Sequence, residues 1–173
     1  MAKTYNTIGL VSAGDPLTET IWNEQATNVN NYRVPPMVIS SGVNTSQSVT
    51  NTTDIILQWT TAPTTDTDGF WSSGANTRFT CTTAGIYQVN AGWEVNSNAL
   101  TGMYMGILRN GSGIIRTGTG SPVSQNNVSR LALSCMVSVT AGQYLEVVVW
   151  QSSSASRVPF AAHFSAAWLG QAS

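Results

Sequence analysis

The chain has 173 residues, of which 42% are hydrophobic and only 9% are charged, and its formal net charge is −1. Its seven Lys and Arg residues are scattered, so no basic region exists that would attract nucleic acid or an acidic membrane. The length favours one β-sandwich with a short appendage over two sizeable cores, with Thr, Ser, Asn and Gln supplying the polar surface.

The N-terminal sequence MAKTYNTIGLVSAGDPL lacks the apolar segment of a secretory signal. The chain also lacks an apolar run of about 18 residues, the length a membrane-spanning helix needs. The prediction is a protein made in the cytoplasm that does not enter a membrane. Its two cysteines, Cys81 and Cys135, are then expected to be free buried thiols rather than a disulfide.

The first segment, residues 1–38, differs in character from the rest and predicts a helix. Asp15-Pro16 or Thr18 can cap the helix, and Pro35-Pro36 ends it. Because a helix of about four turns with one apolar stripe is not stable alone, it needs a partner surface. That surface is the sandwich, the same helix of sister subunits, or another protein. Apolar residues recur at helical spacing at Ile21, Trp22, Ala26, Val29 and Tyr32.

The order of residues in this segment carries a first resemblance to known proteins. The positions concerned are Gly14, Leu17, Thr18, Trp22, Asn23, Asn30 or Asn31, Pro35 and Pro36. In this order they resemble the N-terminal opening of many small bacteriophage virion proteins of the fibre or decoration type. The resemblance implies that residues 1–38 attach the protein to the particle, and a plain helical brace under the sandwich is the alternative. The residues expected to make the attachment are Ile21, Trp22, Val29 and Tyr32.

The second segment, residues 39–173 with the strand that opens at Met37, reads as short strands separated by turns. Turn residues gather at Asp66–Gly69, and Gly118–Asn127 is predicted to be a polar loop. Asn110-Gly111 is a strong hairpin signal. This pattern predicts an all-β antiparallel sandwich or barrel. The expected strands contain Met37–Ile39, Ile55–Trp59, Tyr87–Val95, Met103–Arg109, Ile114–Ile115, Leu131–Val139, Tyr144–Gln151 and Ala162–Trp168.

Four motifs in this region carry a second resemblance. They are Phe79 with Gly85 and Tyr87, Ile107–Gly111, Val139–Leu145 and Phe164–Leu169, the last with Ala166 where glycine is usual. Their order and spacing resemble those of the C1q/TNF-like family. The resemblance implies a ten-stranded jelly roll that assembles as a homotrimer. Residues expected at the trimer interface are Tyr87, Met105, Tyr144, Trp150 and Phe164.

Catalytic chemistry is not expected. The only histidine is His163, which lies in a strand pattern without a Gly-x-Ser-x-Gly motif beside it. Cys81 and Cys135 do not have zinc-ligand spacing, and no cofactor is predicted. Asp66 and Asp68 can help to hold calcium, but shaping a turn is the favoured role. Trp71 is the tryptophan expected to be exposed, so a ligand loop is predicted at Asp66, Asp68 and Trp71.

These expectations point to a virion structural protein on the surface of a phage particle. The favoured role is a trimeric capsid decoration or cement protein, bound to the major capsid protein or another virion protein through residues 1–38. The alternative is a compact tail receptor-binding protein that grips host saccharide with Asp66–Asn76 and Thr117–Asn127. A third reading is a soluble recognition module without a virus, which leaves the phage-like segment unexplained.

Overall fold

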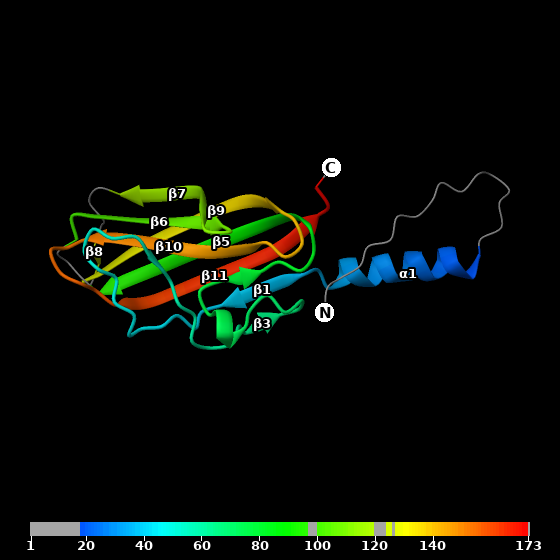
Figure 1. Cartoon of the computed structure of the whole chain (residues 1–173), viewed down its shortest axis with the longest axis horizontal. Coiled ribbons are helices and arrows are strands. Elements are labelled where there is room, and N and C mark those ends of the chain that lie inside the picture. Colours follow the sequence, from blue (N-terminus) through cyan, green and yellow to red (C-terminus); the bar gives the residue numbers. More distant parts are fainter. Residues whose placement is uncertain (1–17, 97–99, 120–123, 126, 173) are drawn as a thin grey trace.

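The computed structural model describes residues 18–96, 100–119, 124–125 and 127–172, and within 30–33, 114–119 and 124–125 it describes only the backbone. The described part contains one α-helix, one short 3₁₀ turn and eleven strands (Figure 1). Their bounds are α1 (Glu19–Arg33), β1 (Met37–Ser40), β2 (Ile55–Ile56), β3 (Thr65–Asp66), η1 (Ser73–Ala75), β4 (Phe79–Thr80), β5 (Gly85–Asn96), β6 (Gly102–Arg109), β7 (Ser112–Thr119), β8 (Ser124–Gln125), β9 (Val128–Val139), β10 (Tyr144–Ser152) and β11 (Pro159–Gly170).

The strands form two antiparallel sheets that pack face to face. The first has six strands in the order β3-β1-β11-β5-β9-β8, and the second has the order β2-β10-β6-β7 with β4 also paired to β10. Neighbours in these sheets come from distant parts of the chain, as in a jelly roll. The predicted all-β antiparallel fold is therefore confirmed. Strand β1 begins at Met37, just before the predicted boundary at residue 38.

The core lies between the two sheets and is built by strands with alternating burial. In β5, Tyr87, Val89 and Ala91 are fully buried, whereas the residues between them are half-buried. The largest side chains meet at the centre, where the rings of Phe79 and Phe164 stack 4.2 Å apart at 1°. The Trp59 ring flanks that pair at 5.3 Å from Phe79 and 6.2 Å from Phe164. This aromatic group fixes the distance between the sheets.

Turn chemistry accounts for the most local connection, the hairpin between β6 and β7. Asn110 and Gly111 have φ values of 50° and 76°, as a two-residue turn of type I′ requires. The Asn110 side chain also accepts a hydrogen bond from the backbone N–H of Tyr144 at 3.0 Å, which ties the turn to β10. The hairpin predicted at this position is confirmed.

Two predicted loops contain short strands. Asp66, placed in a turn cluster, belongs to β3, because Thr65 and Asp66 pair with Ile39 and Val38 of β1. Strand β7 extends to Thr119, and β8 pairs with β9 inside the predicted loop at 118–127. The remainder of that loop, residues 120–123 and 126, lies outside the described residues.

Both cysteines are free thiols, as predicted, with Cys81 buried and Cys135 half-buried. Burial raises the pKa of Cys81 from its usual 9.0 to about 12, and the nearby Asp68 carboxylate adds to this rise. The folded state therefore favours the neutral thiol over the thiolate. Its contribution to stability is complete below pH 9 and is lost progressively as the pH rises from 9 to about 12.

The expected result is an alkaline loss of stability that depends on Cys81. A rise of about three pKa units corresponds to roughly 4 kcal/mol. Denaturant unfolding of the wild type and of Cys81→Ala should be compared between pH 8 and pH 12. The variant starts less stable because it loses packing, but its free energy of unfolding should fall less steeply above pH 9. Parallel curves would contradict the assignment.

Candidate functional site

Helix α1 is the element whose role the packing of the sandwich explains least. Thr18 caps it, with its hydroxyl oxygen accepting from the Ile21 N–H at 3.4 Å, and Glu19 lies in the first turn, where a negative charge is favourable. The helix extends beyond one end of the sandwich rather than over either sheet (Figure 1). Trp22 and Val29 are each 58% exposed. The predicted helix is confirmed. Of the apolar residues predicted to share one stripe, Trp22, Ala26 and Val29 are exposed and Ile21 is half-buried, whereas the Tyr32 side chain lies outside the described part of the structure.

The junction between α1 and β1 is held firmly. The Pro35 carbonyl accepts from the Thr67 hydroxyl at 2.9 Å, and the Pro36 carbonyl accepts from the Trp168 N–H at 2.9 Å. The Met37 N–H donates to the Thr67 hydroxyl oxygen at 2.8 Å. These bonds attach the Pro-Pro segment to β11 and to the loop after β3. The base from which α1 leaves the sandwich is therefore part of the folded domain.

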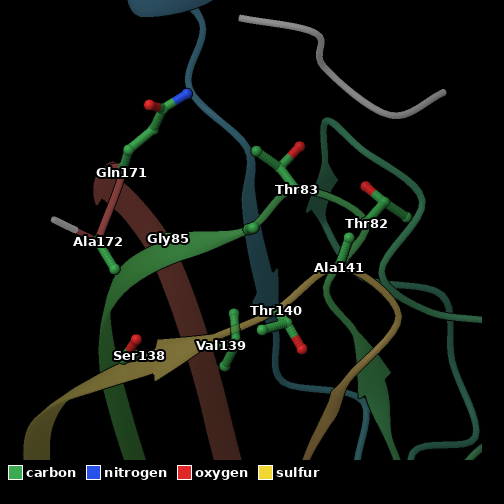
Figure 2. A pocket seen from close by; sticks show the side chains of 10 residues that line it. Thr82, Thr83, Gly85, Ser138, Val139, Thr140, Ala141, Gln171 and Ala172 are labelled. Atoms are coloured by element: carbon green, nitrogen blue, oxygen red, sulfur yellow. The ribbon is translucent and has the colours of Figure 1, made fainter.

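A depression of about 520 Å³ lies at the same end of the sandwich, here called the helix end (Figure 2). It is bounded by the turn before β5, by the turn between β9 and β10, and by the C-terminal residues. Hydroxyl groups, the Gln171 amide and small apolar side chains form the described part of its wall, so the described lining offers hydrogen bonds but no ionisable side chain. The lining residues are Thr82, Thr83, Ala84, Gly85, Ser138, Val139, Thr140, Ala141, Gln171 and Ala172.

The predicted ligand loop is folded into the domain. The Asp66 carboxylate accepts from the backbone N–H groups of Phe70 and Trp71 at 2.8 and 3.1 Å. Asp68 is 1% exposed, and its carboxylate accepts from the hydroxyls of Thr82 and Thr83, the latter at 3.0 Å. Both acids shape the loop, as favoured from the sequence. Within the described part of the chain, no group of three acidic, His or Cys residues could hold a metal ion.

Trp71 corrects the prediction of an exposed stacking residue. Its side chain is half-buried and packs against the core, because the Asp66 carboxylate draws the Phe70 and Trp71 backbone inward. Among the described residues, the buried indole N–H of Trp71 has no hydrogen-bond partner. The loop therefore does not present this ring as an open surface for a sugar.

The predicted trimer interface is corrected at three of its five positions. Tyr87, Met105 and Phe164 are 0% exposed within a single chain, so they belong to the core and have no surface for another copy. Tyr144 and Trp150 are half-buried on the outer face of the second sheet. The Trp150 ring stacks on Tyr104 at 5.3 Å, and the Arg78 guanidinium lies 4.9 Å from the centre of the Tyr144 ring.

The outer face of the six-stranded sheet was not singled out from the sequence. We call the outward side chains of β1, β11, β5 and β9 the six-stranded face. It carries Leu169 near the helix end, and Ile39 and Met136 on the strands that flank β11 and β5; these three residues are 54%, 41% and 68% exposed. Exposed apolar side chains on one sheet face are a mark of a protein-binding surface. The sequence signal that could have indicated this face is the absence of charged residues at the outward positions of β5 between Ile86 and Gly92.

The centre of the six-stranded face is a ladder of uncharged polar side chains. Gln88 donates to the Ser134 hydroxyl oxygen at 2.8 Å, and that hydroxyl donates to the Asn90 side-chain oxygen at 2.8 Å. Asn90 in turn donates to the Ser165 hydroxyl at 3.3 Å. Because these groups satisfy one another, covering the face leaves few polar atoms unpaired.

His163 lies on the same face, farther from the helix end. A Cβ atom on Gly92 would come 2.1 Å from the imidazole Cε1, so only glycine lets the ring lie against the sheet. The depression beside it, about 290 Å³, is also lined by Glu94 and Arg130, which form an ion pair at 3.0 Å. No hydrogen bond joins His163 to a hydroxyl or thiol group in the described part of the chain, so no catalytic pair is seen there.

Comparisons with known proteins show the fold. Murine APRIL, a TNF-family protein, matches with a TM-score of 0.59 at 10% identity, covering 78% of this chain and 98% of its own. The globular domain of zebrafish complement 1qA matches with a TM-score of 0.58 at 9% identity, covering 79% of this chain and 98% of its own. No family model and no curated protein sequence matches the chain.

The protein is thus a C1q/TNF-like jelly roll that carries an additional N-terminal helix. The jelly roll predicted from the four sequence motifs is confirmed. No helix in the described residues is both long enough and apolar enough to cross a membrane.

Proposed function

We propose that this protein is a non-catalytic, homotrimeric structural protein of a bacteriophage virion, attached to the particle by residues 1–38. The observation that carries the proposal is α1, which projects from the helix end with Trp22 and Val29 each 58% exposed. A helix of 15 residues with an unburied apolar stripe is marginal in water, so it is expected to bind another surface. The resemblance of this segment to bacteriophage virion proteins points to a virion protein as that surface.

The trimer is supported by the six-stranded face. Domains that the chain resembles in sequence motif and fold are expected to be trimers, and this face carries exposed apolar side chains beside polar groups that already satisfy one another. The interface that we propose therefore includes Ile39, Met136 and Leu169, in place of the buried residues first predicted. Tyr144 and Trp150, on the other sheet, would lie on the outside of such an assembly.

A position on the capsid is favoured over the tail because the attachment is short. Helix α1 is about 22 Å long at 1.5 Å per residue, and the rigid Pro35-Pro36 junction follows it immediately. The jelly roll would therefore stay close to the surface that α1 binds. We propose a decoration or cement protein that contacts the major capsid protein or another virion protein and bridges neighbouring subunits.

Removal of residues 1–35 tests the attachment. The truncated protein should keep its fold and trimeric mass, because the described contacts of α1 with the sandwich are confined to the junction. It should no longer co-sediment with purified particles that lack the protein, whereas the full chain should bind them. Undiminished co-sedimentation of the truncated protein would refute the assignment.

Gold-labelled antibody on intact particles separates the two virion locations. Label distributed over the head is expected for a decoration protein. Label confined to the tail would instead support the receptor-binding alternative, whose saccharide ligand a glycan array would then identify. Absence of label from every particle would remove the virion role and leave the jelly roll.

A further inference from the structure

We infer that α1 docks as an amphipathic helix into an apolar groove on a different polypeptide of the particle, rather than on the same helix of sister copies. This inference rests on the proposed virion function and names the kind of partner. Trp22, Ala26 and Val29 follow one another at i, i+4 and i+7, so they lie on one face of the helix. All three are exposed. This is the spacing with which helices anchor in the grooves of other proteins.

The opposite face of α1 is polar and suited to water. Thr20 and Thr27 lie on it, and the Thr27 hydroxyl donates to the Asn23 carbonyl at 2.8 Å within the helix. The side chains of both residues are exposed. A partner is thus needed on one side only, which fits an open groove and not a fully enclosed channel.

Self-association as a coiled coil fits the sequence poorly. A heptad register through Trp22 and Val29 places Gln25 at the core position between them. A second register, through Trp22, Ala26 and Val29, places Arg33 at the next core position. A third register, through Ile21, places Gln25 and Asn28 at core positions. Each register thus places a polar or charged residue in a core of only about two heptads.

A membrane surface fits the charges poorly. Helices that lie on membranes carry Lys and Arg along their polar face. Helix α1 has Glu19 and Glu24 in its first half and only Arg33 at its last position. Its net charge is therefore negative, which favours a groove with amide or basic groups beside the first half of the helix.

The sandwich of the same chain is not the partner either. The Pro35 and Pro36 carbonyls are hydrogen-bonded to Thr67 and Trp168, and these bonds direct α1 away from both sheets (Figure 1). Pro36 is buried in the junction. Trp22, Ala26 and Val29 are exposed in this orientation, so the stripe is available to a partner beyond the helix end.

Site-specific photo-crosslinking in the full-length protein tests this inference. Ala26→p-benzoylphenylalanine places the probe on the apolar stripe, and Thr20→p-benzoylphenylalanine is the matched control on the polar face. Both proteins are bound to purified particles that lack the wild type and are irradiated. The expected result is a product from position 26 that joins this chain to one other virion polypeptide, with little from position 20.

Several outcomes would overturn the inference. They are a product of two copies of this chain, a product within the same chain, equal products from both positions, or no product from particle-bound position 26. If the wild type and both variants all fail to bind particles, the proposed virion function itself fails. That outcome is distinguishable from a failure of this inference, in which the protein binds particles but the product from position 26 is not the expected one.

A second measurement distinguishes binding of α1 to another virion polypeptide from association of copies of this chain through α1. Trp22→Ser should weaken particle binding by roughly 30-fold or more, as expected for a buried aromatic anchor. The same variant should leave the mass and the dissociation concentration of the soluble protein unchanged, because the helix does not join the copies. Thr27→Ser on the polar face should change neither. A lower soluble mass for Trp22→Ser would show that α1 holds sister copies together.

Discussion

Gly85→Ala is expected to lower the free energy of unfolding by roughly 3 to 5 kcal/mol, combining backbone strain and overpacking. Gly85 begins β5 with a φ of 147°, a conformation that side-chain-bearing residues rarely adopt. A Cβ atom there would come 2.2 Å from the Trp168 indole nitrogen and 2.3 Å from the Gly170 carbonyl oxygen. Neither neighbour can move cheaply, because β5 and β11 are paired along their length.

The local hydrogen bond adds to this effect. The Trp168 indole N–H donates to the Ala84 carbonyl at 3.0 Å, and the added methyl group would push the ring away from that acceptor. Trp168 also closes one end of the core, where it is 4% exposed. Chemical denaturation at one fixed protein concentration measures the change, since association would otherwise alter the apparent stability.

Gly74→Ala is the matched control. Gly74 lies in the 3₁₀ turn Ser73–Ala75, and nothing lies within 4 Å of the position that its Cβ would occupy. This variant should stay within about 0.5 kcal/mol of the wild type, as for most surface substitutions. Equal stability losses at Gly74 and Gly85 would contradict the account of the β5–Trp168 contact.

Met136→Glu is expected to convert the proposed trimer into monomers. Met136 is 68% exposed on β9, at the side of the six-stranded face, opposite Gln88 in the register of β5 and β9. Burying an unpaired carboxylate in an interface costs several kcal/mol, which is enough to dissociate copies at micromolar concentration. Light scattering should give about 18.4 kDa for the variant and three times this mass for the wild type.

Met136→Gln isolates the effect of charge. Gln has nearly the size of Glu but no charge, and the face already holds the amides of Gln88 and Asn90. The Gln variant should therefore keep most of the trimer. A monomeric wild type would remove the trimer proposal, and a Glu variant of unchanged mass would place the interface on another surface.

Predictions from the sequence succeeded where short-range chemistry decides the structure. Thr18 and Pro35-Pro36 delimit a helix because a side-chain cap begins one and proline cannot continue one. Asn110-Gly111 forms the hairpin turn because both residues accept positive φ. The alternation around Tyr87 places one side of β5 in the core.

Predictions failed where two surfaces of one strand are both apolar. In β6 and β10 the pattern does not distinguish the core from the outside, so Met105 and Trp150 read alike although one is fully buried and the other is not. Trp71 was misjudged because a backbone contact with Asp66, five residues away, turns its loop inward. Strand β3 exists only because β1 is available to pair with it.

The sequence by itself determined the helix, the hairpin and the antiparallel all-β class, because each depends on spacing and turn chemistry within a few residues, whereas the jelly roll was implied by the resemblance of four motifs. Only the tertiary structure decided where a surface for other proteins lies. The six-stranded face draws Ile39, Met136 and Leu169 from three strands far apart in the chain. Their place on one face depends on strand order, which the pairing of distant segments fixes and which no local pattern encodes.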